Sequence, residues 1–271
     1  MPELVPMKAQ VYKDPRPAEY FQPFHLRART REPDATYTVV RILASTVCLT
    51  LFRARSIDRD NVPAVGPVIV APNHFSYADH FFVACFLRRR VRFMGKSQMF
   101  KGVMAKVYSH GGVFPVRRGH RDAEALLTAR TILANGGAIT MYPEGGRSRS
   151  GELASRARPG VGRLALESGA TVVPTAIHGS ARVRNWKRGD FPQVTVHYGR
   201  PMRWEVVEEP TREQQQAVAD EVFAEIRSLY EELESSGRRA VARAARRSRV
   251  RTADDGLGAR VRPAPPADPP Q

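Results

Sequence analysis

The chain has 271 residues, enough for one substantial core with extended ends. Lysine and arginine number 43 against 27 acidic residues, which gives a formal net charge of +16 and predicts an anionic partner: a phosphorylated small molecule, an anionic membrane surface or nucleic acid. The two cysteines, Cys48 and Cys85, lie in apolar stretches, which argues against a disulfide framework or a zinc site. We expect both cysteines to be reduced core residues on the cytosolic side. The first forty residues lack the pattern of a secretory signal peptide.

The N-terminal part predicts an arm and then a membrane-associating helix. Residues 1–35 are expected to form an irregular arm, and residues 36–60 a helix and linker, with Asp34 capping a helix over residues 36–52. The apolar run is shorter than the ~20 residues of a spanning helix, and it contains Arg41. Two interpretations stay open: an interfacial or re-entrant helix that dips into one leaflet, or a buried amphipathic helix of the soluble domain.

The central part alternates short apolar strands with helices. Strands are expected at residues 67–71, 91–95, 112–116, 138–142, 171–177 and 193–198, and helices at 77–88, 101–109, 122–134 and 159–168. This alternation predicts one α/β domain over residues 61–236, with a mainly parallel or mixed sheet flanked by helices. From Thr211 a further helix carries an apolar stripe toward that core.

The last part, residues 237–271, is basic and then Pro-rich, and we expect it to be disordered in solution. Its arginines could settle on anionic lipid, or the tail could be no more than a solvated extension.

The segment Asn73–His80 lies where a buried strand ends and a helix begins, which is the usual place for a ligand in an open α/β sheet. Ser76 followed by Asp79 predicts a capping box, with Ser76 as N-cap and Asp79 at N3. The turn would then bring the His74 imidazole against the Asp79 carboxylate, as a general base needs. By itself the spacing also fits a solvated loop histidine and an ordinary capping aspartate.

Two later segments suit an anion. In Gly111–Gly119 a strand ends in arginines beside glycines, and Arg117 could fork two hydrogen bonds onto a phosphate. In Met141–Gly151 an apolar strand enters a Pro-Glu-Gly-Gly turn followed by arginines and serines. Backbone N–H groups of such a turn can bind an anion or an oxyanion, with Gly145 as the expected place. Glu144 is expected to brace Arg117 or Arg147, or to bond a substrate hydroxyl.

Four motifs in this order resemble those of the glycerolipid acyltransferase family, which includes 1-acyl-glycerol-3-phosphate acyltransferases. They are N-H-x-x-x-x-D from Asn73, G-x-x-F-x-x-R ending at Arg117, P-E-G-x-R-S from Pro143, and a strand containing Val173-Pro174. Gly146 stands where the family commonly has threonine, which affects the acceptor more than the reaction type.

The resemblance implies an α/β fold with an N-terminal membrane-gripping element and a set of site residues. His74 would be the general base and Asp79 its orienting partner. The substrate-binding residues would be Asn73, Lys96, Phe114, Arg117, Glu144, Gly145, Arg147 and Ser148.

The predicted reaction moves a fatty acyl group from acyl-CoA or acyl carrier protein to a lysophospholipid hydroxyl, with 1-acyl-sn-glycerol-3-phosphate as the first choice of acceptor. Neither a metal nor another cofactor is expected. We place the protein at the cytoplasmic face of the cell membrane, peripheral or monotopic. The alternatives are a glycerol-3-phosphate, other lysophospholipid or glycolipid acceptor, a non-catalytic membrane scaffold and, from a different class, a basic nucleic-acid-binding protein. The last lacks an aromatic stacking platform, so no nucleic acid is expected.

Overall fold

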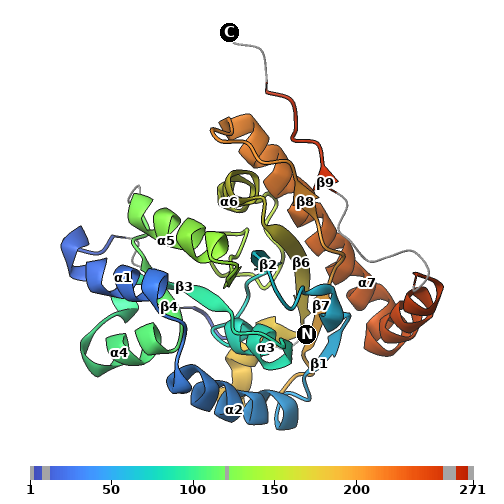
Figure 1. Ribbon diagram of the computed structural model, residues 1–271. Coiled ribbons are helices and arrows are strands. Elements are labelled where there is room, and N and C mark those ends of the chain that lie inside the picture. Colours follow the sequence, from blue (N-terminus) through green and yellow to red (C-terminus); the bar gives the residue numbers. More distant parts are fainter. Residues whose placement is uncertain (1–2, 8–12, 120–121, 253–260, 268–271) are drawn as a thin grey trace.

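A seven-stranded, mostly parallel sheet forms the centre of the computed structural model, which describes residues 3–7, 13–119, 122–252 and 261–267 (Figure 1). The strand order is β1-β7-β6-β2-β5-β3-β4, and β6 with β7 is its one antiparallel pair. The strands are β1 (Arg55–Ile57), β2 (Val68–Pro72), β3 (Arg92–Lys96), β4 (Val113–Val116), β5 (Ala138–Thr140), β6 (Thr171–His178) and β7 (Thr195–Tyr198). The predicted fold class is confirmed.

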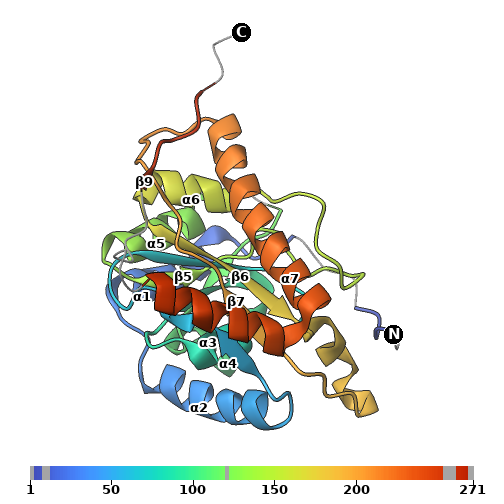
Figure 2. The same cartoon turned by 90° about the vertical axis from the view of Figure 1, so that its right-hand side faces the viewer.

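Helices cover both faces of this sheet. α5, α6 and α7 pack on one face, and α2 and α3 on the other (Figures 1 and 2). The α-helices are α1 (Gln22–Thr30), α2 (Ala35–Thr50), α3 (Asp79–Phe86), α4 (Gly102–His110), α5 (Ala123–Ala134), α6 (Gly160–Ser168) and α7 (Arg212–Thr252). The 3-10 segments are η1 (Ala18–Phe21), η2 (Arg59–Asn61), η3 (Ser97–Met99) and η4 (Ser180–Arg188).

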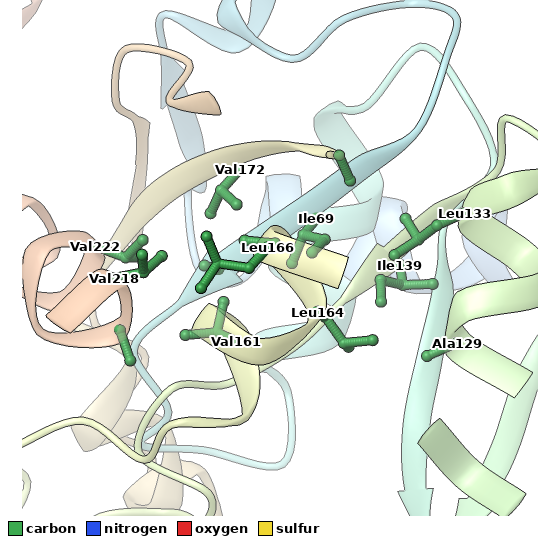
Figure 3. Packing of buried hydrophobic residues seen from close by; sticks show 14 of the residues in the cluster. Ile69, Ala129, Leu133, Ile139, Val161, Leu164, Leu166, Val172, Val218 and Val222 are labelled. Atoms are coloured by element: carbon green, nitrogen blue, oxygen red, sulfur yellow. The ribbon is translucent and has the colours of Figure 1, made fainter. Parts of the chain in front are cut away.

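The core explains why the strands are apolar without interruption. Along β2, Val68 and Val70 belong to the cluster under α2 and α3, whereas Ile69 and Ala71 face the cluster under α5, α6 and α7. All four side chains are fully buried. Figure 3 shows Ile69 among residues of α5, α6 and α7. A strand covered by helices on both faces has no solvent side, so the period-two alternation disappears.

The N-terminal segments fold more than the sequence indicates. The predicted irregular arm contains η1 and α1, and α1 is held by a 2.9 Å contact between His25 Nδ1 and the Thr128 hydroxyl. The predicted domain boundary at residue 61 is also wrong, because β1 pairs with β7 inside the main sheet. The predicted cap of α2 is confirmed, since Asp34 accepts from the Thr36 N–H group.

The C-terminal part departs from the expected disorder. α7 turns sharply at Gly237 (φ 74°, ψ 157°) and continues as residues 238–252, here called the C-terminal arm (Figure 2). Residues 261–262 then form β9, which pairs with β8 (Arg203–Trp204). The Gln214 side chain donates to the Pro265 carbonyl at 2.7 Å. Residues 253–260 and 268–271 of the predicted tail lie outside the described residues.

α2 has one side against the domain and one side exposed. Tyr37 and Cys48 are buried against the α3 layer. The apolar residues that stay exposed on α2 and just after it are Val39, Ile42, Leu43, Val47, Leu49 and Leu51. Among the described helices, none combines the length and the apolar character needed to cross a bilayer. The entry of α2 into a membrane stays a prediction.

Candidate active site

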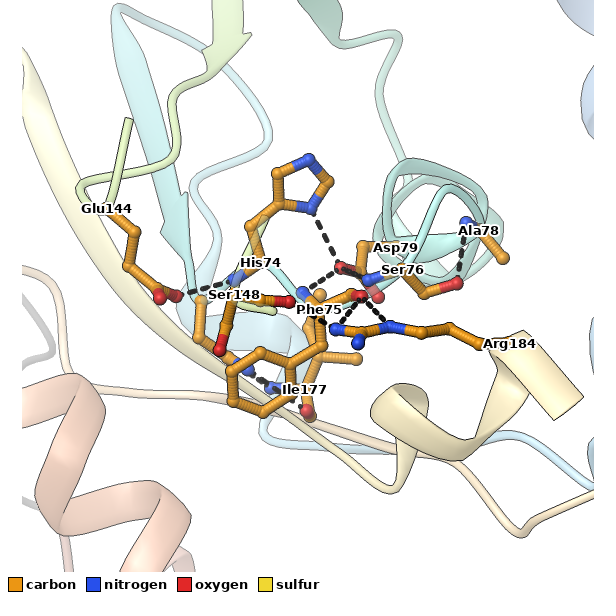
Figure 4. Close-up of polar contacts among 10 residues, drawn as sticks. His74, Phe75, Ser76, Ala78, Asp79, Glu144, Ser148, Ile177 and Arg184 are labelled. Carbon is orange, nitrogen blue, oxygen red and sulfur yellow. Dashed lines mark hydrogen bonds and ion pairs between the residues drawn. The ribbon is translucent and has the colours of Figure 1, made fainter. Parts of the chain in front are cut away.

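The turn between β2 and α3 brings His74 and Asp79 together. His74 Nδ1 lies 2.8 Å from Asp79 Oδ2, as the spacing predicted (Figure 4). The same carboxylate oxygen accepts from the backbone N–H groups of Phe75 at 2.7 Å and Ser76 at 2.8 Å. Asp79 is fully buried, so these donors replace the water that an ionised carboxylate would lose. The pair therefore has a fixed geometry, with Nδ1–H pointing at Asp79.

The start of α3 differs in detail from the predicted capping box. The residue before α3 is Ala78, and α3 begins at Asp79, so Ser76 is not the N-cap. The Ser76 hydroxyl accepts from the Ala78 N–H group at 3.1 Å, two residues on, and Asp79 reaches back to the Ser76 N–H group. Half of the capping box is present, and its carboxylate also binds the His74 ring.

His74 is held as a neutral base. Burial lowers the pKa of its imidazole below the usual 6.5, Asp79 partly offsets this, and the charges of Arg147 and Arg118 lower it further. Tyr142 stacks on the imidazole with ring centroids 3.9 Å apart and an interplanar angle of 19°. Figure 4 shows the second ring nitrogen pointing away from the Asp79 contact. That nitrogen is placed to accept a proton at neutral pH.

The Pro-Glu-Gly-Gly loop grips the main chain of His74. The His74 N–H group donates to Glu144 Oε1 at 2.7 Å, and the His74 carbonyl accepts from the Ser148 N–H group at 2.8 Å. Burial raises the pKa of Glu144 to about 7, although the bonds from the His74 and Ala154 backbone lower it. The prediction that Glu144 braces Arg117 or Arg147 is wrong: its partner is the backbone of the base.

Arg184 was missed by the sequence analysis, although it ties the two loops together. Its Nε and Nη2 both donate to the Phe75 carbonyl, at 3.0 and 2.8 Å (Figure 4). Nη1 donates to the Arg149 carbonyl at 2.8 Å, and Nη2 also donates to the Ser148 carbonyl. Arg184 lies in η4, more than a hundred residues from Phe75 along the chain, and no local pattern marks it.

The charges of Arg118 and Arg147 act on both His74 and Lys96. Lys96 has its pKa lowered to about 8, first by burial and then by the charges of Arg118 and Arg147. The latter two act on His74 as well. Arg147 also lies over the Tyr77 ring, 3.5 Å from its centroid. Lys96 and Arg147 were predicted from the sequence, whereas Arg118, the neighbour of the expected Arg117, was not.

Arg117 itself points to the N-terminal arm. Its Nη2 donates to the Arg16 carbonyl at 3.1 Å, and its guanidinium carbon lies 5.9 Å from the centre of the Phe21 ring. Its backbone N–H group donates to Asp122 at 2.6 Å. The phosphate role of Arg117 stays a prediction.

Three other predicted substrate-binding residues make contacts within the protein. Asn73 is fully buried and exchanges two hydrogen bonds with the backbone of Ile177, at 2.6 and 3.2 Å. Phe114 is fully buried in the core. The Gly145 N–H group donates to the Tyr142 carbonyl at 2.9 Å, which uses up the donor expected for an oxyanion. Asn73 and Phe114 are buried behind the site, so their assignment to substrate contact is corrected. Gly145 is exposed in the loop, and its contact with substrate stays a prediction.

A hollow of about 250 Å³ lies along the Pro-Glu-Gly-Gly loop. Its lining includes Glu144, Arg147, Ser148, Arg149 and Arg158. With more arginines than acids in its lining, this surface suits an anionic group.

A family model described as Acyltransferase matches residues 53–178, which contain the histidine, the aspartate and all four motifs. Residues 53–178 thus form a domain of the Acyltransferase family. In this acyltransferase, Arg184 lies just beyond the matched residues.

Two relatives of the acyltransferase show how far the likeness extends. A chloroplastic 1-acyl-sn-glycerol-3-phosphate acyltransferase of Arabidopsis thaliana, LPAT1, is 24% identical over 149 residues, which are 54% of this chain and 41% of the relative. The match thus spans less than half of the plant protein. The crystal structure of PlsC from Thermotoga maritima, a 1-acyl-sn-glycerophosphate acyltransferase, aligns with a TM-score of 0.58 at 20% identity, covering 79% of this chain and 89% of that one. The second likeness establishes the fold.

Proposed function

We propose that this protein transfers a fatty acyl group from a thioester, acyl-CoA or acyl carrier protein, to a lysophospholipid hydroxyl. The observation that carries the proposal is the buried contact of 2.8 Å between His74 Nδ1 and Asp79 Oδ2. Its setting, with Lys96, Arg118 and Arg147 acting on the same site, favours an acceptor with a phosphate. The relatives' names support 1-acyl-sn-glycerol-3-phosphate as the acceptor and phosphatidic acid as the product.

The chemistry needs one base and no covalent enzyme intermediate. His74 Nε2 takes the proton of the acceptor hydroxyl as its oxygen attacks the thioester carbonyl, while Asp79 stabilises the imidazolium. The tetrahedral intermediate collapses, the C–S bond breaks, and the imidazolium returns its proton to the leaving thiolate. The Gly146 and Arg147 N–H groups make no hydrogen bond within the described chain, and we place the oxyanion donors there.

The substrates also imply where the enzyme works. A lysophospholipid and its product reside in a bilayer, and the exposed apolar side of α2 offers a surface for insertion at the interface. We therefore propose peripheral or monotopic attachment at the cytoplasmic face of the cell membrane.

The direct test is free-thiol release from acyl-CoA in the presence of a panel of lysolipids. His74→Ala should lower kcat by about 10²–10⁴, the usual contribution of general-base catalysis. His110→Gln, a change of a half-exposed histidine in α4, should stay near wild type. A His74→Ala enzyme that keeps its fold and near-normal turnover would remove the base assignment.

The phosphate site has its own test. Arg118→Gln should raise the KM for 1-acyl-glycerol-3-phosphate by about 10-fold or more and leave the KM for acyl-CoA near its original value, because one charged hydrogen bond contributes about 1.5–3 kcal/mol. Arg117→Gln should raise the acceptor KM less, because the charge of Arg118 acts on both His74 and Lys96, whereas the Arg117 guanidinium lies by Phe21 in the N-terminal arm. A larger rise in the acceptor KM for Arg117→Gln than for Arg118→Gln would indicate that Arg117 binds the phosphate.

A further inference from the structure

The C-terminal arm carries arginines that the proposed reaction does not use. Val241 is 2% exposed and packs in a cluster with Ile57 and Ala176, so this side of the arm faces the sheet. Within residues 238–248, the part of the arm whose side-chain exposure is described, the exposed arginines are Arg239, Arg243, Arg246 and Arg247.

These four arginines occupy one side of the helix. Their spacing of four, seven and eight residues places them within roughly 100° of the helix circumference, at 3.6 residues per turn. The other exposed residues between residues 238 and 248 are Ala240, Ala244 and Ser248. No acidic residue lies between residues 238 and 252, and within the described chain none of the four arginines forms an ion pair. The exposed side of the arm up to residue 248 therefore carries positive charge that no acidic side chain of the arm balances.

The arm joins the molecule where α2 ends. Arg238 Nη1 donates to the Arg53 carbonyl at 3.0 Å, and burial together with the charges of Arg55, Arg239 and Arg53 lowers the pKa of Arg238. Uncompensated positive charge therefore collects at this junction. The exposed Leu51 of α2 lies two residues before Arg53. Figure 2 shows the arm crossing the side of the molecule by β7, with α2 below it.

We propose that the arginine stripe of the C-terminal arm docks on the anionic headgroups of a lipid bilayer, beside the place where α2 meets the apolar layer. The docking proposal rests on the proposed function, because the substrates of that function are bilayer lipids. Guanidinium groups bind phosphate oxygens in pairs, which suits headgroups held side by side. Nucleic acid carries phosphates too, but it would leave the exposed apolar residues of α2 next to the stripe unexplained.

The test compares two triple variants of the full chain. The arm variant is Arg243→Gln/Arg246→Gln/Arg247→Gln, in which glutamine preserves helix propensity. The control variant, Arg130→Gln/Arg156→Gln/Arg212→Gln, removes the same charge from exposed positions on α5, the loop before α6 and the start of α7. Co-sedimentation uses phosphatidylcholine vesicles with and without one-third phosphatidylglycerol, at low and high salt.

The arm variant should bind the anionic vesicles about 100-fold more weakly than wild type at low salt, and the control variant much less weakly. Both should match wild type on neutral vesicles, and salt of about 1 M should remove the difference because it screens exposed charges. Equal losses for the two variants would overturn the proposal, and so would tighter binding of a DNA duplex than of anionic vesicles. Acylation of a lysolipid in detergent micelles tests the reaction separately from the docking. An arm variant that is as active as wild type has an intact active site. A wild-type protein without activity would reject the proposed reaction, but it would not affect the result of the vesicle experiment.

Discussion

Asp79 receives three donors on one carboxylate oxygen, from the His74 ring and from the backbone N–H groups of Phe75 and Ser76. All of these partners lie within five residues, so a local sequence pattern was enough to predict the contact. Glu144 and Arg184 reach the same turn from 70 and 109 residues away. Their partners are backbone groups, which every residue has, so the sequence gives no sign of the pairing.

Glu144 should make the stability of the protein depend on pH. Its pKa rises from 4.5 to about 7 on folding, so the folded state favours the protonated carboxyl. This contribution is fully present below pH 4.5 and is lost as the pH rises through 7, to a total of roughly 3 kcal/mol. Glu144→Gln stays neutral and should lose less stability than wild type between pH 5 and pH 8, as measured by urea unfolding. Identical changes for both proteins would show that Glu144 titrates normally.

Arg184 should act on turnover through position. Arg184→Lys cannot serve three carbonyls with a planar fork, so the turn carrying His74 should shift against the Pro-Glu-Gly-Gly loop. We expect kcat to fall by about 10–100-fold, with the acceptor KM changing much less. The control is Arg182→Lys in the same segment, whose guanidinium pairs with Asp190. If Arg184→Lys and Arg182→Lys lower kcat equally, Arg184 does not position the turn that carries His74.

At the scale of elements, the apolar runs predicted the six expected strands to within about two residues. The elements that were missed have little apolar content. The buried residues of α1 are His25 and Ala28, and the C-terminal arm buries Val241. β1 is a strand because β7 pairs with it, not because Arg55 and Ser56 favour one. Tertiary contacts stabilise these elements, and such contacts cannot be read from a single sequence.

The packing of α6 on α7 depends on Gly162. A Cβ atom there would lie 1.9 Å from the Gln215 carbonyl oxygen, which belongs to the backbone of α7. Gly162→Ala must push the helices apart and should cost about 1–3 kcal/mol of stability, the usual penalty of overpacking.

The matched control for Gly162 lies in the same helix. A Cβ atom at Gly160 would meet the flexible end of Met141, so Gly160→Ala should be neutral or slightly stabilising. Thermal unfolding of both variants gives the comparison. If Gly162→Ala is as stable as Gly160→Ala, the two helices do not approach as closely as described.

The whole molecule combines an exposed apolar side of α2 with an excess of positive charge. The apolar exposure comes from the residues on the outer side of α2. The net charge of +16 includes the arginines of the C-terminal arm and the basic residues of the site. The composition alone predicted an anionic partner, but not where each cation would lie. The kink at Gly237 and the pairing of β1 with β7 decide where these arginines lie, and both are visible only in the structure.

The pairing of β1 with β7 also has a consequence for synthesis. Arg55 is opposite Thr195, so the first strand meets its neighbour only after about 140 further residues have been made. At 5–20 residues per second a ribosome takes roughly 7–30 s over that distance. During this interval the nascent chain holds an apolar helix and an unmatched strand edge, so it must be shielded from self-association while translation continues.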